Sequence, residues 1–451
     1  MKKLSLVLAA VLISASAFAD QYIVTFRGNT VPADFAAQVA AVGGTITFQH
    51  PILAIVDGLD ATGAAKLGAG SGIASIDADA QFTLDEGAPA VAEEAFVAPD
   101  SANAPSTAFF FARQWHLRAI GADQAWAAGR LGSPSVTVAV LDTGIDRQAS
   151  PHADLAGHVD YARGHQFQLD NPACIPAAPF TFSPTDDLVF HGTHVAATIS
   201  SNALAAAGVT SKVTLVPVKV LGLTKDANGR CTAGSGSNAN VLAGVLYAAD
   251  INADVANMSL GGGFSKAGNG RLNGLINKVF NYAHAHGTLV VVSAGNSAAD
   301  LDHDGNFNVT FCNAPNVVCV AATGPTNNST NGPWVNIDAP AFYTNFGRSA
   351  ISVAAPGGNG SFVWAACSRS AASVGLAVCR TGTFIVGAEG TSMASPHVSG
   401  LAALLVEQIG HNNPSAIKAA LQQTADDLGQ PGTDPFYGKG FINVPRALGL
   451  Q

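Results

Sequence analysis

Short apolar runs alternate with amphipathic stretches from Arg113 onward. The runs are nearly continuous in hydrophobicity, which is typical of strands that are buried on both faces. They are SVTVAVLDTG, KVTLVPVKVLG, ADVANMSLGGG and TLVVVSAGN. The stretches between them, such as RLNGLINKVFNYAHAHG, carry apolar residues at helical spacing, and Gly287 supplies a helix stop. This alternation predicts an α/β fold, with a parallel β-sheet flanked by helices on both faces.

Residues 21–84 predict a separate small domain. YIVTF indicates a strand, PADFAAQVAAVGG a helix, TITFQHPILAIVDGL two strands, ATGAAKLGAG a short helix and IASIDADAQFTL one final strand. The order β-α-β-β-α-β predicts a ferredoxin-like α+β arrangement. Residues 85–112, which are rich in Ala, Pro, Glu and Ser and show no clear period, predict a linker.

The first 19 residues have the organisation of a secretory signal peptide. Lys2 and Lys3 precede an apolar run, and Ala17-Phe18-Ala19 supplies a cleavage site before Asp20. The run is short for a membrane span, and nothing comparable recurs. We therefore expect an exported protein with no membrane attachment.

Composition narrows the class of protein further. The chain has 451 residues, of which 48% are hydrophobic and 12% charged, so it can bury a large core and does not resemble a disordered protein. Of its net charge of −9, most falls before residue 113, where 4 Lys and Arg face 11 Asp and Glu. This balance gives no sign of a nucleic-acid partner.

Six cysteines in an exported chain predict disulfides rather than buried thiols. Six cysteines allow 15 connectivities. Proximity in sequence favours Cys312 with Cys319 and Cys367 with Cys379, which leaves Cys174 with Cys231.

An acid, a base and a hydroxyl stand out against this background. Asp142 ends a predicted strand, His191 begins a small-residue helix, and Ser392 stands at the start of a long helix that has Pro396 in its first turns. Together they are what an activated serine nucleophile requires. Taken singly, Ser392 and Asp142 could cap a helix and a turn, and HGTH could hold a metal although its spacing is not that of HExxH.

The three motifs VAVLDTGID, HGTHVA and GTSMASPH occur in that order. From about Arg113 to Ala447 the chain resembles the subtilisin-like serine proteases, or subtilases. The resemblance implies that Ser392 is the nucleophile, His191 the general base and Asp142 the acid that orients it, within a catalytic domain of residues 113–451. Residues 20–84 resemble the inhibitory propeptide of that family, which also acts as an intramolecular chaperone, and the maturation site then falls within 85–112.

The resemblance also assigns a substrate site. NMSLGGG matches the strand that pairs with bound peptide, and AGSGSN matches the opposite edge of the cleft. Asn296, together with the Ser392 backbone N–H, matches the oxyanion donors. The residues implied in peptide binding are Gly234, Ser235, Gly236, Ser259, Leu260 and Gly261.

One stretch departs from the family pattern. In DLDHDGNFN (300–308), the residues Asp300, Asp302 and Asp304 resemble the opening of a calcium loop, but the twelfth position is Phe311 instead of Glu. The sequence therefore allows two interpretations of this stretch, a structural Ca²⁺ site or a solvated acidic loop. We also expect Met393, next to the nucleophile, to be exposed to oxidation.

The sequence thus predicts a secreted serine endopeptidase that is made as a self-processing zymogen. We expect it to be a monomer that hydrolyses proteins or peptides and needs no cofactor for catalysis. An α/β-hydrolase would place its serine in G-x-S-x-G, whereas Ser392 lies in G-x-S-x-A. A sedolisin would have Glu in place of His191, and a silent peptide-binding homologue would lack one of the three residues.

Overall fold

The computed structural model describes residues 21–84, 91–95, 101–147, 152–175, 182–226, 228–371, 379 and 383–450. The predicted signal peptide lies outside the described residues. The chain divides into a small compact unit that ends at Asp79 and a large one that begins at Ala80. Each unit is described by itself.

The small unit has the predicted order of elements. They are β1 (Gln21–Phe26), α1 (Phe35–Ala41), β2 (Thr45–Gln49), β3 (Ala54–Asp57), α2 (Ala61–Gly68) and β4 (Ile73–Ala78), with a 3₁₀ turn η1 (Arg27–Asn29). The sheet order is β2-β3-β1-β4 and every neighbouring pair is antiparallel, as in ferredoxin-like domains. Val24, Phe35 and Leu67 lie in its own apolar core.

One predicted strand of this region is two strands. The run IASIDADAQFTL is interrupted after β4, whose pairing with β1 ends with Ala78 opposite Tyr22, the second residue of β1. The chain then enters the large unit, in which Gln81–Thr83 forms β5.

The large unit is built on a seven-stranded sheet of order β17-β16-β14-β12-β7-β9-β8, in which all neighbours are parallel. The strands are β7 (Thr137–Asp142), β8 (His165–Gln166), β9 (Thr214–Lys219), β12 (Val255–Met258), β14 (Leu289–Ser293), β16 (Val318–Thr323) and β17 (Val353–Pro356). Five of them, β7, β12, β14, β16 and β17, are buried throughout, as the apolar runs predict for β7, β12 and β14.

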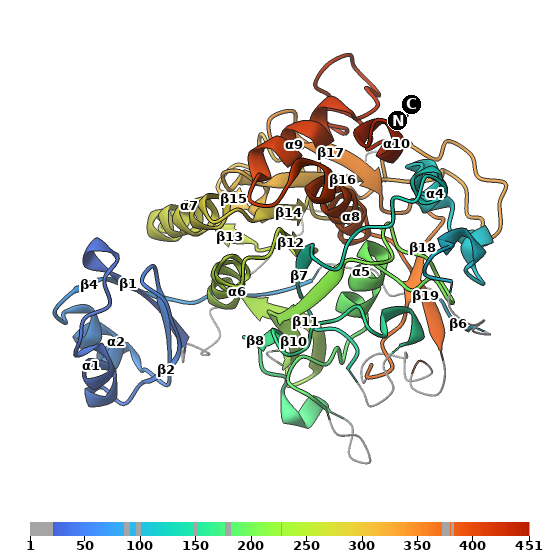
Figure 1. The fold of residues 1–451 in the computed structure, drawn as a ribbon. Coiled ribbons are helices and arrows are strands. Elements are labelled where there is room, and N and C mark those ends of the chain that lie inside the picture. Colours follow the sequence, from blue (N-terminus) through green and yellow to red (C-terminus); the bar gives the residue numbers. More distant parts are fainter. Residues whose placement is uncertain are drawn as a thin grey trace, which may run out of the picture. The chain divides into compact units, whose positions relative to one another are not determined.

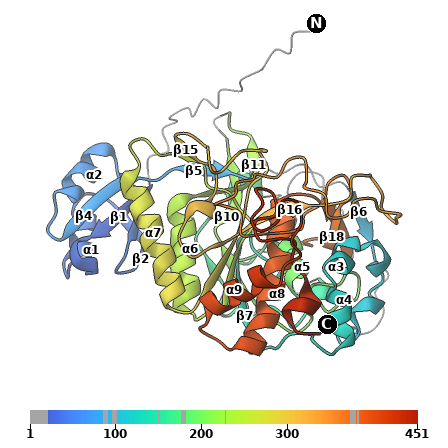
Figure 2. The ribbon, with the colours of Figure 1, turned by 90° about the horizontal axis from the view of Figure 1, so that it is seen from above.

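Helices cover both faces of this sheet (Figures 1 and 2). On one side lie α6 (Asn238–Asp250) and α7 (Gly270–Ala285), and on the other α5 (His191–Ile199) and α8 (Thr391–Ile409). The predicted α/β fold is confirmed. The remaining helices are α3 (Trp115–Ala119), α4 (Ala122–Ala127), α9 (Pro414–Gln423), which packs on α8, and α10 (Val444–Ala447).

Smaller sheets and turns surround the main sheet. They comprise β10 (Leu221–Lys225) and β11 (Cys231–Ser237), the pair β13 (Phe264–Ser265) and β15 (Phe307–Asn308), and the 3₁₀ turns η4 (Ala153–Leu155), η5 (Pro172–Cys174) and η6 (Phe311–Asn313). The cysteines pair as proximity in sequence suggests, Cys174–Cys231, Cys312–Cys319 and Cys367–Cys379. Across the described ranges, no helix is long and apolar enough to cross a membrane.

The described part of 85–112 packs on the large unit. β6 (Val91–Glu94) extends the hairpin of β18 (Val363–Ala366) and β19 (Phe384–Ala388) in the order β18-β19-β6, and η2 (Pro105–Thr107) and η3 (Phe111–Arg113) follow. Arg113 forms an ion pair with Glu93 and lies over the rings of Phe110 and Trp364. These residues are thus part of the large unit and do not form an extended spacer.

Candidate active site

Asp142 and His191 form a buried pair at the carboxyl end of β7. Asp142 is the last residue of β7 and His191 the first of α5. His191 Nδ1 lies 2.7 Å from Asp142 Oδ1, and the two residues are 1% and 0% exposed. Since an ionised carboxylate can only accept, Nδ1 is the donor and Nε2 is the basic nitrogen of the ring.

Burial raises the pKa of Asp142, and the neighbouring His191 opposes that rise. Asp142 Oδ1 also accepts the Thr143 N–H at 2.7 Å. The carboxylate is therefore held by two donors that favour its charged form.

Asp187 fixes the segments on either side of this pair. Its Oδ1 accepts the Thr143 hydroxyl at 2.8 Å and the N–H groups of Val189 and Phe190, both at 2.9 Å. Its Oδ2 accepts the Thr193 N–H at 2.9 Å and the Thr193 hydroxyl at 2.6 Å. One fully buried carboxylate thus binds the residue after Asp142 and the residues that flank His191.

Phe190 has an unusual backbone conformation directly before the histidine. Its φ of 126° and ψ of −28° lie outside the regions that side-chain-bearing residues prefer. Such strain persists where surrounding contacts enforce it, often at functional sites. Here the hydrogen bond from Phe190 N–H to Asp187 is one of those contacts.

Ser392 lies in the first turn of α8, as predicted. Pro396 follows within the same helix, and Ser259 replaces the hydrogen bond that it removes. The missing N–H of Pro396 would have bonded to Ser392 O, and that carbonyl instead accepts the Ser259 hydroxyl at 2.7 Å. The Ser392 hydroxyl donates to Ser259 O at 3.3 Å. Because α5 packs against α8, the helices that carry His191 and Ser392 are neighbours.

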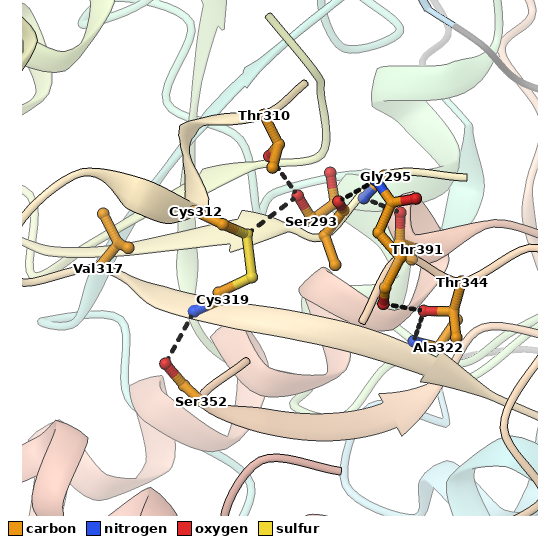
Figure 3. Close-up of a disulfide and its surroundings, with 12 residues drawn as sticks. Ser293, Gly295, Thr310, Cys312, Val317, Cys319, Ala322, Thr344, Ser352 and Thr391 are labelled. Atoms are coloured by element: carbon orange, nitrogen blue, oxygen red, sulfur yellow. Dashed lines mark hydrogen bonds between the residues drawn. A yellow bond between two sulfur atoms is a disulfide. The ribbon is translucent and has the colours of Figure 1, made fainter. Parts of the chain in front are cut away.

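Asn296 is held by Thr391, the residue before Ser392. Its Oδ1 accepts the Thr391 N–H at 2.9 Å and the Thr391 hydroxyl at 2.8 Å. Thr391 Oγ1 in turn accepts the Gly295 N–H at 2.9 Å (Figure 3). These contacts direct the NH₂ end of the amide away from Thr391. The sequence did not single out Thr391.

The Gly-Ser edge Gly234–Gly236 is paired with a segment of the same chain. β5 runs antiparallel to β11, with Thr83 opposite Ser235 and Phe82 opposite Gly236. Leu84 N–H donates to Gly234 O at 3.0 Å. Gly234 has φ +70°, and a Cβ there would lie 2.8 Å from Leu84 Cδ1. The sequence did not predict β5 at this edge, since its partner strand is about 150 residues away.

β5 and Ser392 line the same cavity of about 250 Å³, whose walls carry no charged side chain. The lining residues are Phe82, Thr83, Leu84, Gly261, Gly262, Gly263, Ser293, Gly295, Asn296, Ser297, Val309, Thr391 and Ser392. Of the residues implied at the second edge, Gly261 lines the cavity, whereas Ser259 and Leu260 are fully buried.

The acidic loop does not gather its carboxylates. Asp300 bonds to His303, Asp302 accepts from Ser349 N and Oγ, and Asp304 forms an ion pair with Lys266. Within the described ranges, no group of three or more His, Cys, Asp or Glu side chains could hold a metal ion. The geometry favours the acidic-loop alternative.

The expectation for Met393 was wrong. Its side chain is fully buried in the main core.

Comparison with known proteins decides the family. The sequence model described as "Subtilase family" matches residues 133–440. This chain belongs to the subtilase family. The subtilase is 31% identical over 347 residues to thermitase of Thermoactinomyces vulgaris, covering 76% of this chain and 99% of thermitase. It is 30% identical over 337 residues to subtilisin DY of Bacillus licheniformis, covering 73% of this chain and 96% of subtilisin DY. The family and these relatives make the chain a serine endopeptidase.

A solved structure supports the fold of the subtilase. Fervidolysin of Fervidobacterium pennivorans, a keratinolytic enzyme related to subtilisin, superposes with a TM-score of 0.66 and 24% identity over 95% of this chain and 61% of that one. This likeness concerns the fold alone.

Proposed function

We propose that this subtilase is exported as an inactive precursor, cleaves itself, and then hydrolyses proteins or peptides through an acyl-enzyme on Ser392. The observation that carries the proposal is the cavity shared by Ser392, Asn296 and Phe82–Leu84. A segment of the chain's own N-terminal region lies there as an added strand, which is how an extended peptide binds an open sheet edge.

In the proposed reaction, His191 Nε2 takes the Ser392 proton as Oγ attacks the scissile carbonyl carbon. The hydroxyl must first turn from Ser259 O towards His191, a rotation about one side-chain bond. Asp142 holds the ring and stabilises the imidazolium. His191 then protonates the leaving amine, and water hydrolyses the acyl-enzyme by the same steps. Side chains and backbone supply every group, so no cofactor takes part in catalysis.

The oxyanion would be stabilised from two sides. The Ser392 N–H lies at the N-terminus of a 19-residue helix, where the backbone dipoles favour negative charge. The Asn296 amide, which Thr391 orients, would supply the second donor.

We further propose that residues 20–84 are the inhibitory prosegment and that 113–451 contains the catalytic machinery. Leu84 lies in the cleft, and Val91 begins a strand of the large unit, so we place the maturation cut between them. The predicted signal peptide and three disulfides support export to an oxidising compartment, and we propose that the mature enzyme acts as a monomer.

Labelling with a fluorophosphonate probe tests this assignment. We expect the probe on Ser392, and we expect Ser392→Ala to accumulate as uncut precursor that does not hydrolyse casein at neutral or alkaline pH. Ser399→Ala, which changes another buried serine of α8, is the matched control and should mature and be labelled. Normal maturation of Ser392→Ala would refute the proposal.

A further inference from the structure

We propose that the Cys312–Cys319 disulfide sets substrate selectivity, because it braces the rear wall of the cavity beside Ser392. The inference rests on the proposed function, since a bound peptide is needed to read out the shape of this cavity. Neither cysteine is among the residues that line the cavity, so the disulfide acts by positioning the wall.

The cavity is the place for the side chain that precedes the scissile bond. It lies between Ser392 and Asn296, which would act on the scissile carbonyl, and the segment Phe82–Leu84. Its walls are glycines, serines, a valine and other uncharged residues. A large uncharged side chain would therefore fill it and reach its rear wall, whereas a small one would not.

Four consecutive residues, Val309 to Cys312, form or support the rear wall. Val309 lines the cavity directly. The Thr310 hydroxyl donates to Ser293 O at 2.9 Å, and Ser293 is also a lining residue. The Phe311 ring supports the second edge of the cleft, because a Cβ on Gly262 would lie 2.5 Å from it.

Cys312 completes this wall and ties it to the main sheet (Figure 3). Its sulfur contacts Ser293 O at 3.7 Å, a contact without a shared proton because a disulfide sulfur carries none. Its partner Cys319 lies within β16, opposite Val292 of β14. The Cys319 N–H also donates to Ser352 Oγ at 3.1 Å. The bond therefore joins the wall to two strands that are buried throughout.

The other contacts of the wall with the protein core are non-covalent. Thr310 has one hydrogen bond to Ser293 O, and Phe311 stacks on Phe280 with ring centroids 5.9 Å apart. Without the disulfide, these contacts would leave the wall able to shift, and placement within about 0.5 Å matters for a binding pocket. Large side chains would lose contacts there, whereas small side chains would be unaffected.

The test compares matched peptide substrates that differ only in the residue before the scissile bond, Phe against Ala. The wild-type chain and the double variant Cys312→Ala/Cys319→Ala are produced as full precursors and assayed after self-processing. We expect the ratio of kcat/KM for the Phe peptide to kcat/KM for the Ala peptide to fall about tenfold in the double variant, mainly through KM. A tenfold change is the discrimination that one or two methylenes give in an apolar pocket. Cys367→Ala/Cys379→Ala, which removes a disulfide outside the cavity lining, should leave the ratio within about twofold.

Thr310→Val provides a second route to the same measurement if the double variant does not fold. It keeps the disulfide and removes the hydrogen bond to Ser293 O, so the Phe/Ala ratio should fall about threefold, a modest hydrogen-bond effect. An unchanged ratio in both the folded double variant and Thr310→Val, or an equal fall in the Cys367/Cys379 control, would overturn the inference and leave the protease assignment intact. Failure of the wild-type enzyme to cleave either peptide would overturn both.

Discussion

At the scale of single residues, the site depends on side chains that never touch a substrate. Thr143 follows the predicted catalytic acid, donates its hydroxyl to Asp187 and accepts the N–H of Gly192 at 2.9 Å. It thereby links the strand of Asp142 to the helix of His191. Small displacements of such groups have large kinetic effects, because reacting atoms must be held in a narrow geometry.

Thr143→Val should lower kcat about tenfold and leave KM within about twofold, since the two hydrogen bonds of the lost hydroxyl are together worth about 1.4 kcal/mol. Steady-state kinetics on a peptide anilide measure both constants. Thr143→Ser keeps the hydroxyl and should recover kcat to within about threefold. Equal loss in the two variants would show that the methyl packing and not the hydroxyl matters.

Thr391→Val should also lower kcat, because it removes the Thr391 hydroxyl that bonds Asn296 Oδ1, while the bond from the Thr391 backbone N–H to the same oxygen remains. We expect about a tenfold loss, smaller than that of Asn296→Ala. For Asn296→Ala we take over the loss of about 10²–10³ in kcat that removal of an oxyanion donor causes in subtilisin. A Thr391→Val enzyme with wild-type kcat would contradict the orienting role.

At the scale of elements, regular structure was predictable where its cause is local. Strands β7, β9, β12 and β14 and helices α6 and α7 of the large unit follow from hydrophobic period alone, and the small unit from five short patterns. β5 and β6 could not be predicted, because each owes its conformation to a partner far along the chain, β11 and β19 respectively. The start of α8 near Ser392 was predictable, whereas the Ser259 hydroxyl that bonds the carbonyl left free by Pro396 was not.

The division of residues 21–84 into a small domain plus β5 gives a direct test of inhibition in trans. A peptide of residues 21–84 should inhibit the mature enzyme at micromolar concentration. A shorter peptide of residues 21–79 retains β1–β4 and lacks β5. It should bind at least about tenfold more weakly, because it has lost a few backbone hydrogen bonds to the enzyme. Inhibition constants from progress curves decide this. Equal potency of the two peptides would contradict a role for β5 in the cleft.

At the scale of the whole molecule, buried charge gives stability a dependence on pH. Asp186 is 1% exposed, and burial raises its pKa to about 6, with a further rise from the neighbouring Asp146 carboxylate. Its folded pKa is higher than its unfolded one, so its contribution is most favourable at acidic pH and is lost as the pH rises through 6.

Asp186→Asn should therefore stabilise the protein more at pH 8 than at pH 5, by about 1–3 kcal/mol for a shift of this size. The Ser392→Ala background prevents self-digestion, and denaturant unfolding at the two pH values gives the comparison. Lys219 bonds the backbone carbonyl of residue 186, so the substitution leaves that contact in place. The same stabilisation at both pH values would exclude Asp186 as the source.

The sequence predicted the residues proposed to react at the candidate site, but not the residues that hold them in position. Asp142, His191 and Ser392 follow from motifs whose residue types the reaction itself demands. Asp187, Thr143 and Thr391 are ordinary polar residues in sequence, and their roles come from hydrogen bonds that only the folded chain creates. The disulfide pairing followed from proximity for two of the bonds and by elimination for the third.

The position of the three disulfides affects how this enzyme should be manufactured. Cys231 begins the strand that carries Gly234–Gly236, and Cys312 lies next to the cavity wall, so two of the bonds reinforce surfaces that we propose to bind peptide. A bacterial cytoplasm keeps thiols reduced. Recombinant protein harvested from that compartment would lack these covalent supports, and secretion into the periplasm or refolding with an oxidant is the appropriate route.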